Sequence, residues 1–281
     1  MNIICIVVTY NPQLSILCKS INNLLQQKVR VIIVDNSNIY TNYLSINSDI
    51  TVIYNGCNLG IAKAQNIGID YALSQGADFV LFMDQDSLAP NNLVDTLVRC
   101  YEQKSKESLV GGVGPLPYNR DNNKAYFTKN NNEEIVEVNT LISSGSFVSR
   151  EMLVEVGYMD DSLFIDMVDL EWCWRATYKT KCRFYINNKC LLSHSLGKRE
   201  VIFLRKRIPL HSPMRMYYRF RNYFLLVNRK YVPLSWKFRY PVSNITRLLL
   251  CLCYFSEKRI YLKNSYKGFK DGLRCFFHKS R

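Results

Sequence analysis

The sequence predicts an α/β fold with a mostly parallel central sheet flanked by helices, and three observations favour it. Short apolar runs rich in β-branched residues alternate with segments whose apolar residues recur at helical spacing. The apolar runs contain few polar residues, as expected for strands that are buried on both faces. Polar residues follow several of these runs directly, at the edge where ligands bind to open α/β sheets.

The first hundred residues are expected to alternate strands and helices. Each strand is a short apolar run, and four are predicted, at Ile3–Val8, Val29–Val34, Ile50–Tyr54 and Phe79–Met83. Three segments have apolar residues at helical spacing, from Pro12 to about Gln26, over Ile61–Ser74 and over Leu93–Glu102. Strands that alternate with helices in this way form βαβ units, so their sheet is parallel.

The remainder of the chain has a less regular pattern. Extended segments are predicted at Val110–Val113, Leu141–Ser149, Arg183–Ile186 and Cys190–His194, and helices after Arg150 and over Val168–Tyr178. Residues 118–134 are polar and rich in asparagine, which predicts a surface excursion. From about Ile202 onward the sequence is basic, aromatic and helical in pattern.

Charge is distributed very unevenly. The 281 residues carry a net charge of +14, but residues 1–197 hold 16 Lys and Arg against 20 Asp and Glu, a net of −4. Residues 198–281 hold 21 Lys and Arg against 3 Asp and Glu, a net of +18. A segment this basic is expected to meet an anionic surface, such as a membrane leaflet, or to cover an apolar docking helix.

Cysteine usage and hydropathy indicate the compartment. The ten cysteines include no C-x-x-C pair, which argues against a structural zinc site. The apolar first residues are typical of a strand rather than of a signal peptide. The longest apolar run near the C-terminus, Leu248–Phe255, is far shorter than the ~20 residues of a membrane-spanning helix. We expect a cytoplasmic protein with reduced thiols that lies on the inner face of the membrane.

Two aspartates follow the fourth predicted strand, in the sequence Asp84-Gln85-Asp86. Their carboxylates suit Mg²⁺ or Mn²⁺, and Mg²⁺ is usually held by one or two carboxylates together with substrate phosphates. By itself the triplet is more typical of a turn or a helix cap. Asp86 is the better candidate for direct metal contact, Asp84 is expected to contact ribose or metal-bound water, and Gln85 is expected to be a spacer.

Other strand ends supply residues for a nucleotide. They are expected to share one edge of the sheet with the aspartates, and they are Thr9, Tyr10, Asp35, Asn58 and Gly60. Asp35 can accept a hydrogen bond from a pyrimidine N–H, although Asp35-Asn36-Ser37 also fits a simple turn. The first strand lacks the glycine fingerprint of dinucleotide-binding folds, and the chain has no P-loop motif.

In this order and spacing, four segments resemble the family 2 glycosyltransferases of the GT-A fold: Val8-Thr9-Tyr10-Asn11-Pro12, Val34-Asp35-Asn36-Ser37, Asn58-Leu59-Gly60 and Asp84-Gln85-Asp86-Ser87. The segment from Phe164 to Ala176, followed by His194-Ser195-Leu196-Gly197, is similar to the rhamnosyltransferase branch of that family. The match covers roughly residues 3–197. The Gln-x-x-Arg-Trp motif of processive synthases is absent.

The resemblance implies roles for particular residues. Arg175 puts Asp169 at the family's general-base position, although Val168 replaces the usual preceding Glu. His194 corresponds to a histidine that joins the metal site in related enzymes. We assign three further residues to acceptor binding, namely Glu171, Trp172 and Ser144. Asp169 as a helix cap, His194 as a structural residue and Trp172 as a core residue are the simpler alternatives.

The function implied is an inverting, metal-dependent transfer of a sugar. The resemblance suggests dTDP-L-rhamnose as donor and a saccharide acceptor, such as a glycan linked to polyprenyl diphosphate, in O-antigen or capsule synthesis. We expect a catalytic domain over residues 1–200, with its nucleotide-sugar half at about 1–110 and its acceptor half at about 111–200. A basic amphipathic helical region is expected over 201–281.

Three alternatives remain at this point. The same fold could use another donor, such as a UDP-sugar. A metal-dependent nucleotidyltransferase would also hold phosphates through strand-end aspartates, but it would not account for Asp169 and His194. A nucleic-acid-binding protein would use the basic segment, but the acidic strand ends would repel a polyanion.

Overall fold

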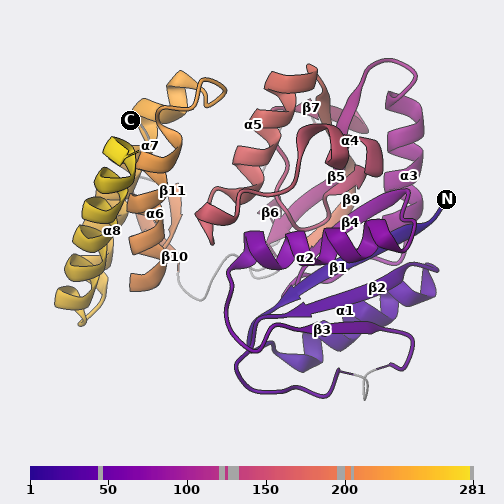
Figure 1. Cartoon of the computed structure of the whole chain (residues 1–281), viewed down its shortest axis with the longest axis horizontal. Helices are drawn as coiled ribbons and strands as arrows, with labels where there is room; N and C mark the ends of the chain where they lie inside the picture. Colours follow the sequence, from indigo (N-terminus) through magenta and orange to yellow (C-terminus); the bar gives the residue numbers. More distant parts are fainter. Residues whose placement is uncertain (44–46, 120–123, 126–132, 195–199, 204–205, 279–281) are drawn as a thin grey trace.

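The computed structural model describes residues 1–43, 47–119, 124–125, 133–194, 200–203 and 206–278, and Figure 1 shows their arrangement. A nine-stranded sheet forms the centre, with the strand order β3-β2-β1-β4-β8-β5-β9-β7 and β6 paired with β5. Helices cover the sheet, and the C-terminal helices lie together beside it (Figure 1). The predicted α/β architecture, a central sheet flanked by helices, is confirmed.

The first half of the sheet is parallel. Its strands are β1 (Ile3–Thr9), β2 (Arg30–Asp35), β3 (Thr51–Tyr54) and β4 (Phe79–Asp84), and its helices are α1 (Leu14–Gln26), α2 (Ile61–Ser74) and α3 (Leu93–Lys104). Alternate strand residues enter two separate cores. Cys5 and Val7 pack with residues of α1 and α3, whereas Ile4 and Ile6 pack with residues of α2. Burial on both faces explains the uninterrupted apolar runs.

The second half of the sheet is mixed. It contains β5 (Val110–Asn119), β6 (Lys124–Ala125), β7 (Ile135–Val138), β8 (Phe147–Ser149) and β9 (Arg183–His194), together with the helices α4 (Arg150–Val156), η2 (Asp161–Leu163) and α5 (Val168–Thr180). Strand β8 is antiparallel to both β4 and β5, and β7 is antiparallel to β9.

Three details of this sheet differ from the sequence-based expectation. The strand expected at Leu141–Ser149 is limited to Phe147–Ser149, and a loop precedes it. The two extended segments expected at Arg183–Ile186 and Cys190–His194 form one strand, β9. Strand β5 pairs with both parts of β9, with a shift in register between Pro115 and Leu116. Strand β7 was not predicted, since an edge strand of four residues carries little periodic signal.

The C-terminal part begins with a hairpin rather than a helix. Strands β10 (Glu200–Phe203) and β11 (Lys206–Pro209) pair with each other, and α6 (Pro213–Leu226), α7 (Leu234–Tyr254) and α8 (Lys258–His278) follow. Helix α8 crosses α6 closely at Gly268, where an added Cβ would lie 2.2 Å from the backbone oxygen of Tyr217. Among the residues described, none of the helices is long and apolar enough to cross a membrane.

Candidate active site

Three predicted nucleotide-contacting residues lie side by side at the carboxyl edge of the parallel strands. The register pairs Thr9 of β1 with Asp35 of β2, and Val8 of β1 with Asp84 of β4. Because parallel strands end at a common edge, the backbone brings Thr9, Asp35 and Asp84 together.

The two carboxylate oxygens of Asp35 differ in their hydrogen bonding. Asp35 is 1% exposed, and its Oδ1 accepts from Thr9 Oγ1 (2.9 Å), Ser37 N (3.0 Å) and Ser37 Oγ (2.7 Å). Its Oδ2 is buried without a hydrogen-bond partner among the described residues. A buried acceptor without a donor is costly, so this oxygen is suited to a ligand N–H.

Gln85 has a structural function that the sequence did not indicate. Its Oε1 accepts from the backbone N–H of Tyr10 (2.7 Å), and its Nε2 donates to the Tyr10 carbonyl (3.2 Å). Gln85 therefore ties the end of β4 to the end of β1 and is more than the spacer that was expected. The Tyr10 side chain is 43% exposed beside this link.

Asn58 and Gly60 organise the turn before α2. Asn58 Oδ1 accepts from Gly60 N (3.0 Å), and Asn36 Nδ2 donates to the Gly60 carbonyl (3.1 Å). Gly60 has a φ of +83°, and a Cβ at this position would lie 2.5 Å from the Phe164 ring. The backbone groups of Gly60 are thus bonded within the protein, and its missing side chain makes room for the loop before α5.

Ser144 supports the aspartate turn from inside the protein. It is 1% exposed; its Oγ accepts from Asp84 N (3.2 Å) and donates to Ser87 Oγ (2.7 Å). These contacts fix the turn that carries Asp84 and Asp86. A buried hydroxyl group that is bonded on both sides offers an acceptor no surface, so the acceptor role assigned to Ser144 does not fit its position.

Asp169 lies in the first turn of α5, at the wall of a small pocket. Its Oδ2 accepts from Ser143 N (3.3 Å), and its Oδ1 accepts from Leu170 N (2.9 Å). Burial raises the pKa of the Asp169 carboxyl group above its ordinary value, and the negative charge of Asp166 acts in the same direction, while the backbone hydrogen bonds act against it. A raised pKa makes a carboxylate a stronger base.

The two halves of the site are joined through consecutive residues. Ser143 donates to Asp169, and its neighbour Ser144 accepts from the backbone of Asp84. The loop before β8 therefore fixes the candidate base relative to the aspartate turn. Three predicted site residues from distant parts of the sequence, Asp84, Ser144 and Asp169, therefore meet at this loop.

The loop that leads into α5 has an unusual backbone conformation. Phe164, Asp166 and Met167 have φ values of 63°, 64° and 72°, a region that side chains other than glycine rarely adopt. Such conformations persist only where surrounding contacts enforce them, and they cluster at functional sites.

Helix α6 supplies those contacts. Arg215 Nη2 and Nε donate to the two carboxylate oxygens of Asp166 at 2.5 and 3.3 Å. Burial by itself raises the pKa of Asp166, but the Arg215 guanidinium outweighs it and holds the pKa below its ordinary value. Asn222, which is fully buried, donates to the carbonyls of Leu163, Ile165 and Asp166.

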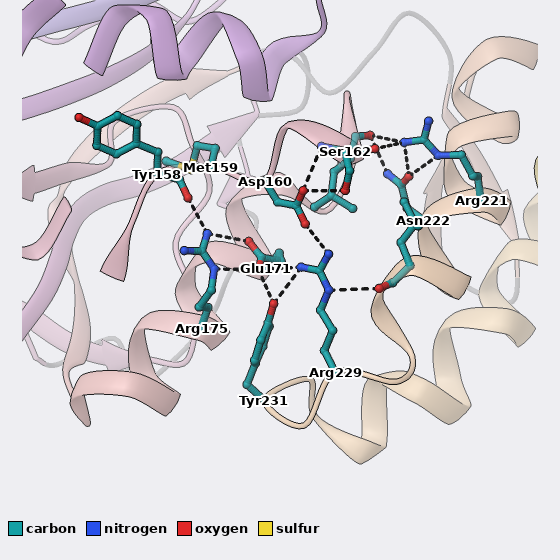
Figure 2. A network of polar contacts seen from close by, with 12 residues as sticks. Tyr158, Met159, Asp160, Ser162, Glu171, Arg175, Arg221, Asn222, Arg229 and Tyr231 are labelled. Atoms are coloured by element: carbon teal, nitrogen blue, oxygen red, sulfur yellow. Dashed lines mark hydrogen bonds and ion pairs between the residues drawn. The ribbon is translucent and has the colours of Figure 1, made fainter. Parts of the chain in front are cut away.

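Glu171 is the centre of a buried polar network, which Figure 2 shows from close by. It is 0% exposed and accepts from Arg175 Nε (2.9 Å), Arg229 Nη1 (2.9 Å) and the Tyr231 hydroxyl (2.6 Å). Arg229 also forms an ion pair with Asp160. Because Glu171 is surrounded by hydrogen-bond donors of the protein, it joins α5 to the C-terminal helices. It does not reach an acceptor substrate, so the predicted acceptor-binding role does not fit its position.

The other two predicted residues of this region have different outcomes. Trp172 is 3% exposed and its indole Nε1 donates to the Gly157 carbonyl (2.8 Å), so it is a core residue rather than an acceptor platform. His194 ends β9, and its side chain lies outside the described residues. Its predicted metal role stays a prediction.

A divalent cation fits the donor set at the end of β4. Asp84 and Asp86 are two residues apart on one turn, and both are partly buried. Within the described part of the chain, no group of three or more His, Cys, Asp or Glu side chains could hold a metal by itself. Two carboxylates therefore need oxygen ligands from a bound phosphate to complete the coordination, which is the usual arrangement for Mg²⁺.

The residues that sequence reasoning missed are the inward-facing arginines of the C-terminal region and Asn222. Arg229 is 58 residues from Glu171, and Arg215 is 49 residues from Asp166. The one signal that the sequence offers for these contacts is Asn222, a polar amide residue within a helix pattern that is otherwise aromatic, aliphatic and basic. Part of the C-terminal positive charge is therefore structural, because it neutralises buried carboxylates beside the candidate base.

The sheet edge with its unpartnered Asp35 oxygen, its aspartate turn and the candidate base on α5 defines a glycosyltransferase of the GT-A class. Comparison with known proteins agrees. The chain belongs to glycosyl transferase family 2, whose model matches residues 4–157. It is 36% identical to dTDP-rhamnosyl transferase RfbF of Shigella flexneri over an alignment of 288 positions, which covers 97% of this chain and 96% of that protein.

Solved structures share the fold. S. aureus TarS 1–349 in complex with UDP-GlcNAc has a TM-score of 0.59 and 16% identity, over 98% of this chain and 80% of that chain. GalNAc-T7 with UDP, GalNAc and Mn²⁺ has a TM-score of 0.55 and 15% identity, over 87% of this chain and 55% of that chain. The match to the longer TarS structure spans 45% of that chain. At these identities the likeness concerns the fold alone.

Proposed function

We propose that this chain transfers L-rhamnose from dTDP-L-rhamnose to a hydroxyl group of a saccharide acceptor, with inversion at the anomeric carbon. The link between Asp169 and Asp84 through Ser143 and Ser144 carries the proposal. It holds a candidate base and a candidate phosphate-side carboxylate in one fixed frame. The similarity to a dTDP-rhamnosyl transferase over almost the whole chain supports this choice of donor.

The thymine base fits the end of β2. Its N3–H is a donor, and Asp35 Oδ2 is a buried acceptor that lacks one. The diphosphate would then extend from β1 toward Asp84 and Asp86, which would hold Mg²⁺ or Mn²⁺ together with its oxygens. When bound, the cation offsets the negative charge that develops on the leaving diphosphate.

Asp169 is the proposed general base. Its carboxylate takes the proton of the acceptor hydroxyl group while that oxygen attacks the anomeric carbon. The bond between this carbon and the diphosphate oxygen breaks in the same displacement, and dTDP leaves. The raised pKa of Asp169 brings its basicity closer to that needed for proton transfer near neutral pH.

Transfer assays test this assignment. We expect release of dTDP from dTDP-rhamnose in the presence of Mg²⁺ or Mn²⁺, and losses of activity in Asp169→Asn and Asp86→Ala. UDP-sugars assayed in parallel decide between donors. Near-normal transfer by either variant would exclude the mechanism, and release of pyrophosphate would indicate nucleotidyl transfer instead.

We also propose that α7 and α8 lie on an anionic membrane, where a polyprenyl-diphosphate-linked acceptor of O-antigen or capsule synthesis would be found. Helix α8 exposes Leu262 (49%), Tyr266 (68%) and Phe269 (44%) at four- and three-residue spacing, and Phe277 (61%) eight residues further on. Exposed cations follow each of the first three directly, at Lys263, Lys267 and Lys270. Adjacent apolar and cationic stripes are typical of helices that lie in a membrane interface.

Vesicle binding tests this membrane contact. We expect the protein to sediment with vesicles of phosphatidylglycerol and phosphatidylcholine, less so at high salt, and not with phosphatidylcholine alone. The triple variant Lys263→Glu, Lys267→Glu, Lys270→Glu should lose binding. A control with the same change in charge on the catalytic part, Lys19→Glu, Arg99→Glu, Lys106→Glu, should retain it. Equal losses in both variants would contradict a specific membrane face.

A further inference from the structure

A large cleft lies between α5 and the start of α7, away from the donor edge of the sheet. Its volume is about 970 Å³, within the range of small-molecule sites. Its walls come from α5, from the segment 137–140 at the end of β7, from residues 182–184 at the start of β9, and from the segment 230–239. None of the residues assigned to the donor lines it, so the cleft requires its own explanation.

Two residues of the lining are close in sequence to Asp169 and Ser143, which themselves line the small pocket described above. Leu170, the residue after Asp169, lines it, and so does Thr140, three residues before Ser143. The lining residues Leu170, Trp174 and Tyr178 form one face of α5, which extends the cleft over about 12 Å at the usual helical rise, and Lys181 lines it just after the helix ends.

The lining is aromatic on both walls. Trp174 and Trp236 meet edge to face with their centroids 5.4 Å apart, and the rings of Tyr178 and Tyr231 are 6.1 Å apart. Tyr178 remains 51% exposed. Such rings offer flat apolar faces with polar edges, which suit the apolar faces and hydroxyl groups of sugar rings.

The far end of the cleft is cationic. Lys230 and Arg239 line it, both are exposed, and neither forms an ion pair with a residue that the structure describes. The one carboxylate in the lining, Glu137, already pairs with Arg183 at 3.1 Å. The end near α7 therefore presents two available cations, to which a phosphate is the complementary partner.

This cationic end opens onto an apolar stripe. Leu234 lines the cleft and is also the first of a series of exposed apolar residues on α7, with Phe238 (76%), Val242 (64%), Ile245 (54%) and Leu249 (57%). The residues recur every three or four positions, so they share one helix face. Sugar-binding, phosphate-binding and lipid-compatible surfaces thus follow one another from Leu170 to Leu249.

We propose that this cleft is the acceptor track and that it binds a prenyl-linked glycosyl diphosphate. The glycan lies along Tyr178 and Trp174, the diphosphate contacts Lys230 and Arg239, and the prenyl chain follows the exposed face of α7. This inference rests on the proposed glycosyl transfer, because the lining residue Leu170 directly follows the proposed base Asp169.

Binding measurements with the donor site blocked test the track directly. With saturating dTDP present, binding of a farnesyl diphosphate-linked N-acetylglucosamine is compared with that of methyl N-acetylglucosaminide and inorganic pyrophosphate. We expect the glycosyl diphosphate to bind most tightly. Loss of each charge-assisted contact weakens binding about tenfold, so Lys230→Glu with Arg239→Glu should remove this preference.

Two further variants separate the track from general effects. Lys19→Glu with Lys106→Glu changes the charge equally but lies elsewhere, and it should bind the probe like wild type. Tyr178→Ala should weaken binding of the probe, whereas Tyr178→Phe, which keeps the ring, should not. Probe binding that is unchanged in the Lys230/Arg239 variant would overturn the track. If dTDP itself fails to bind wild-type protein, the proposed function fails instead.

Discussion

Arg229 donates from Nη1 to Oε1 of Glu171 over 2.9 Å, with the Glu171 side chain completely buried. This ion pair joins the segment after α6 to the helix that begins with the candidate base. The basic C-terminal region is therefore a part of the active-site architecture as well as a candidate membrane surface. Its inward cations pair with buried carboxylates, its outward cations are the proposed membrane contacts, and separate experiments can distinguish the two groups.

Removing the charge of Asp169 should increase stability while it strongly lowers activity. The folded-state pKa of Asp169 is raised, so the unfolded state releases this proton more readily, and ionisation favours unfolding as the pH rises. Asp169→Asn removes that cost. We expect a higher Tm at pH 7 and a fall in kcat/KM of about 10²- to 10⁴-fold, the usual contribution of a general base.

The same residue predicts the pH dependence of transfer. A general base must be deprotonated, so kcat/KM should fall with decreasing pH at a pKa above the ordinary value of an aspartate. Activity and Tm measured over a pH series test both effects. Asp95→Asn, an exposed control on α3, should change neither; a lower Tm in Asp169→Asn would indicate a structural carboxylate.

Breaking the Glu171 network should destabilise the protein strongly. Removing one partner of a buried ion pair leaves an uncompensated charge and costs about 3–5 kcal/mol. Glu171→Ala and Arg229→Ala should each lower the free energy of unfolding in urea by that amount. Because they remove the same interaction, the double variant should lose clearly less than the sum. Additive losses would show that Glu171 and Arg229 act independently.

Gly60 should tolerate no side chain, and Gly56 provides a matched control. Both have positive φ, +83° and +67°, but a Cβ at Gly56 meets nothing within 4 Å, whereas at Gly60 it would collide with Phe164. Gly56→Ala should cost about 1 kcal/mol from backbone strain alone. Gly60→Ala should cost a further ~1–3 kcal/mol from overpacking, measured by denaturant unfolding, and should lower activity by shifting the loop before α5. Equal costs would argue against this contact.

Asp35→Asn should weaken binding of dTDP. Three donors surround Oδ1, so the substituted amide group would direct its N–H₂ to the position of Oδ2, opposite the thymine N3–H. A lost hydrogen bond to a charged acceptor corresponds to about 1.5–3 kcal/mol, or roughly ten- to a hundredfold in Kd. Calorimetric titration with dTDP measures this. Unchanged affinity would show that the base binds elsewhere.

Much of the catalytic half could be predicted because its signals are local. The uninterrupted apolar runs of β1 and β4 predicted buried parallel strands, and parallel strands fix a common edge. It follows that Thr9, Asp35 and Asp84 lie together. The candidate-base role of Asp169 was inferred from a family resemblance, through its spacing to Arg175. The structure adds that the backbone N–H of Ser143 donates to Asp169.

The errors arose where a residue type fits two environments. Glu171, Trp172 and Ser144 suit an acceptor surface in composition, yet all three are buried and hydrogen-bonded. Burial depends on which residues cover a side chain, and Arg229, which covers Glu171, is 58 positions away from it in the sequence. A single sequence carries no signal for such a pairing.

The sequence by itself determined the alternation of strands and helices, the polar strand ends and the division of charge, since these follow from short-range pattern and composition. Only the tertiary structure decided which cations of the C-terminal region point inward to Asp166 and Glu171 and which face outward on α8. The physical reason is that a buried carboxylate must be neutralised by whichever guanidinium the packing of α6 brings to it.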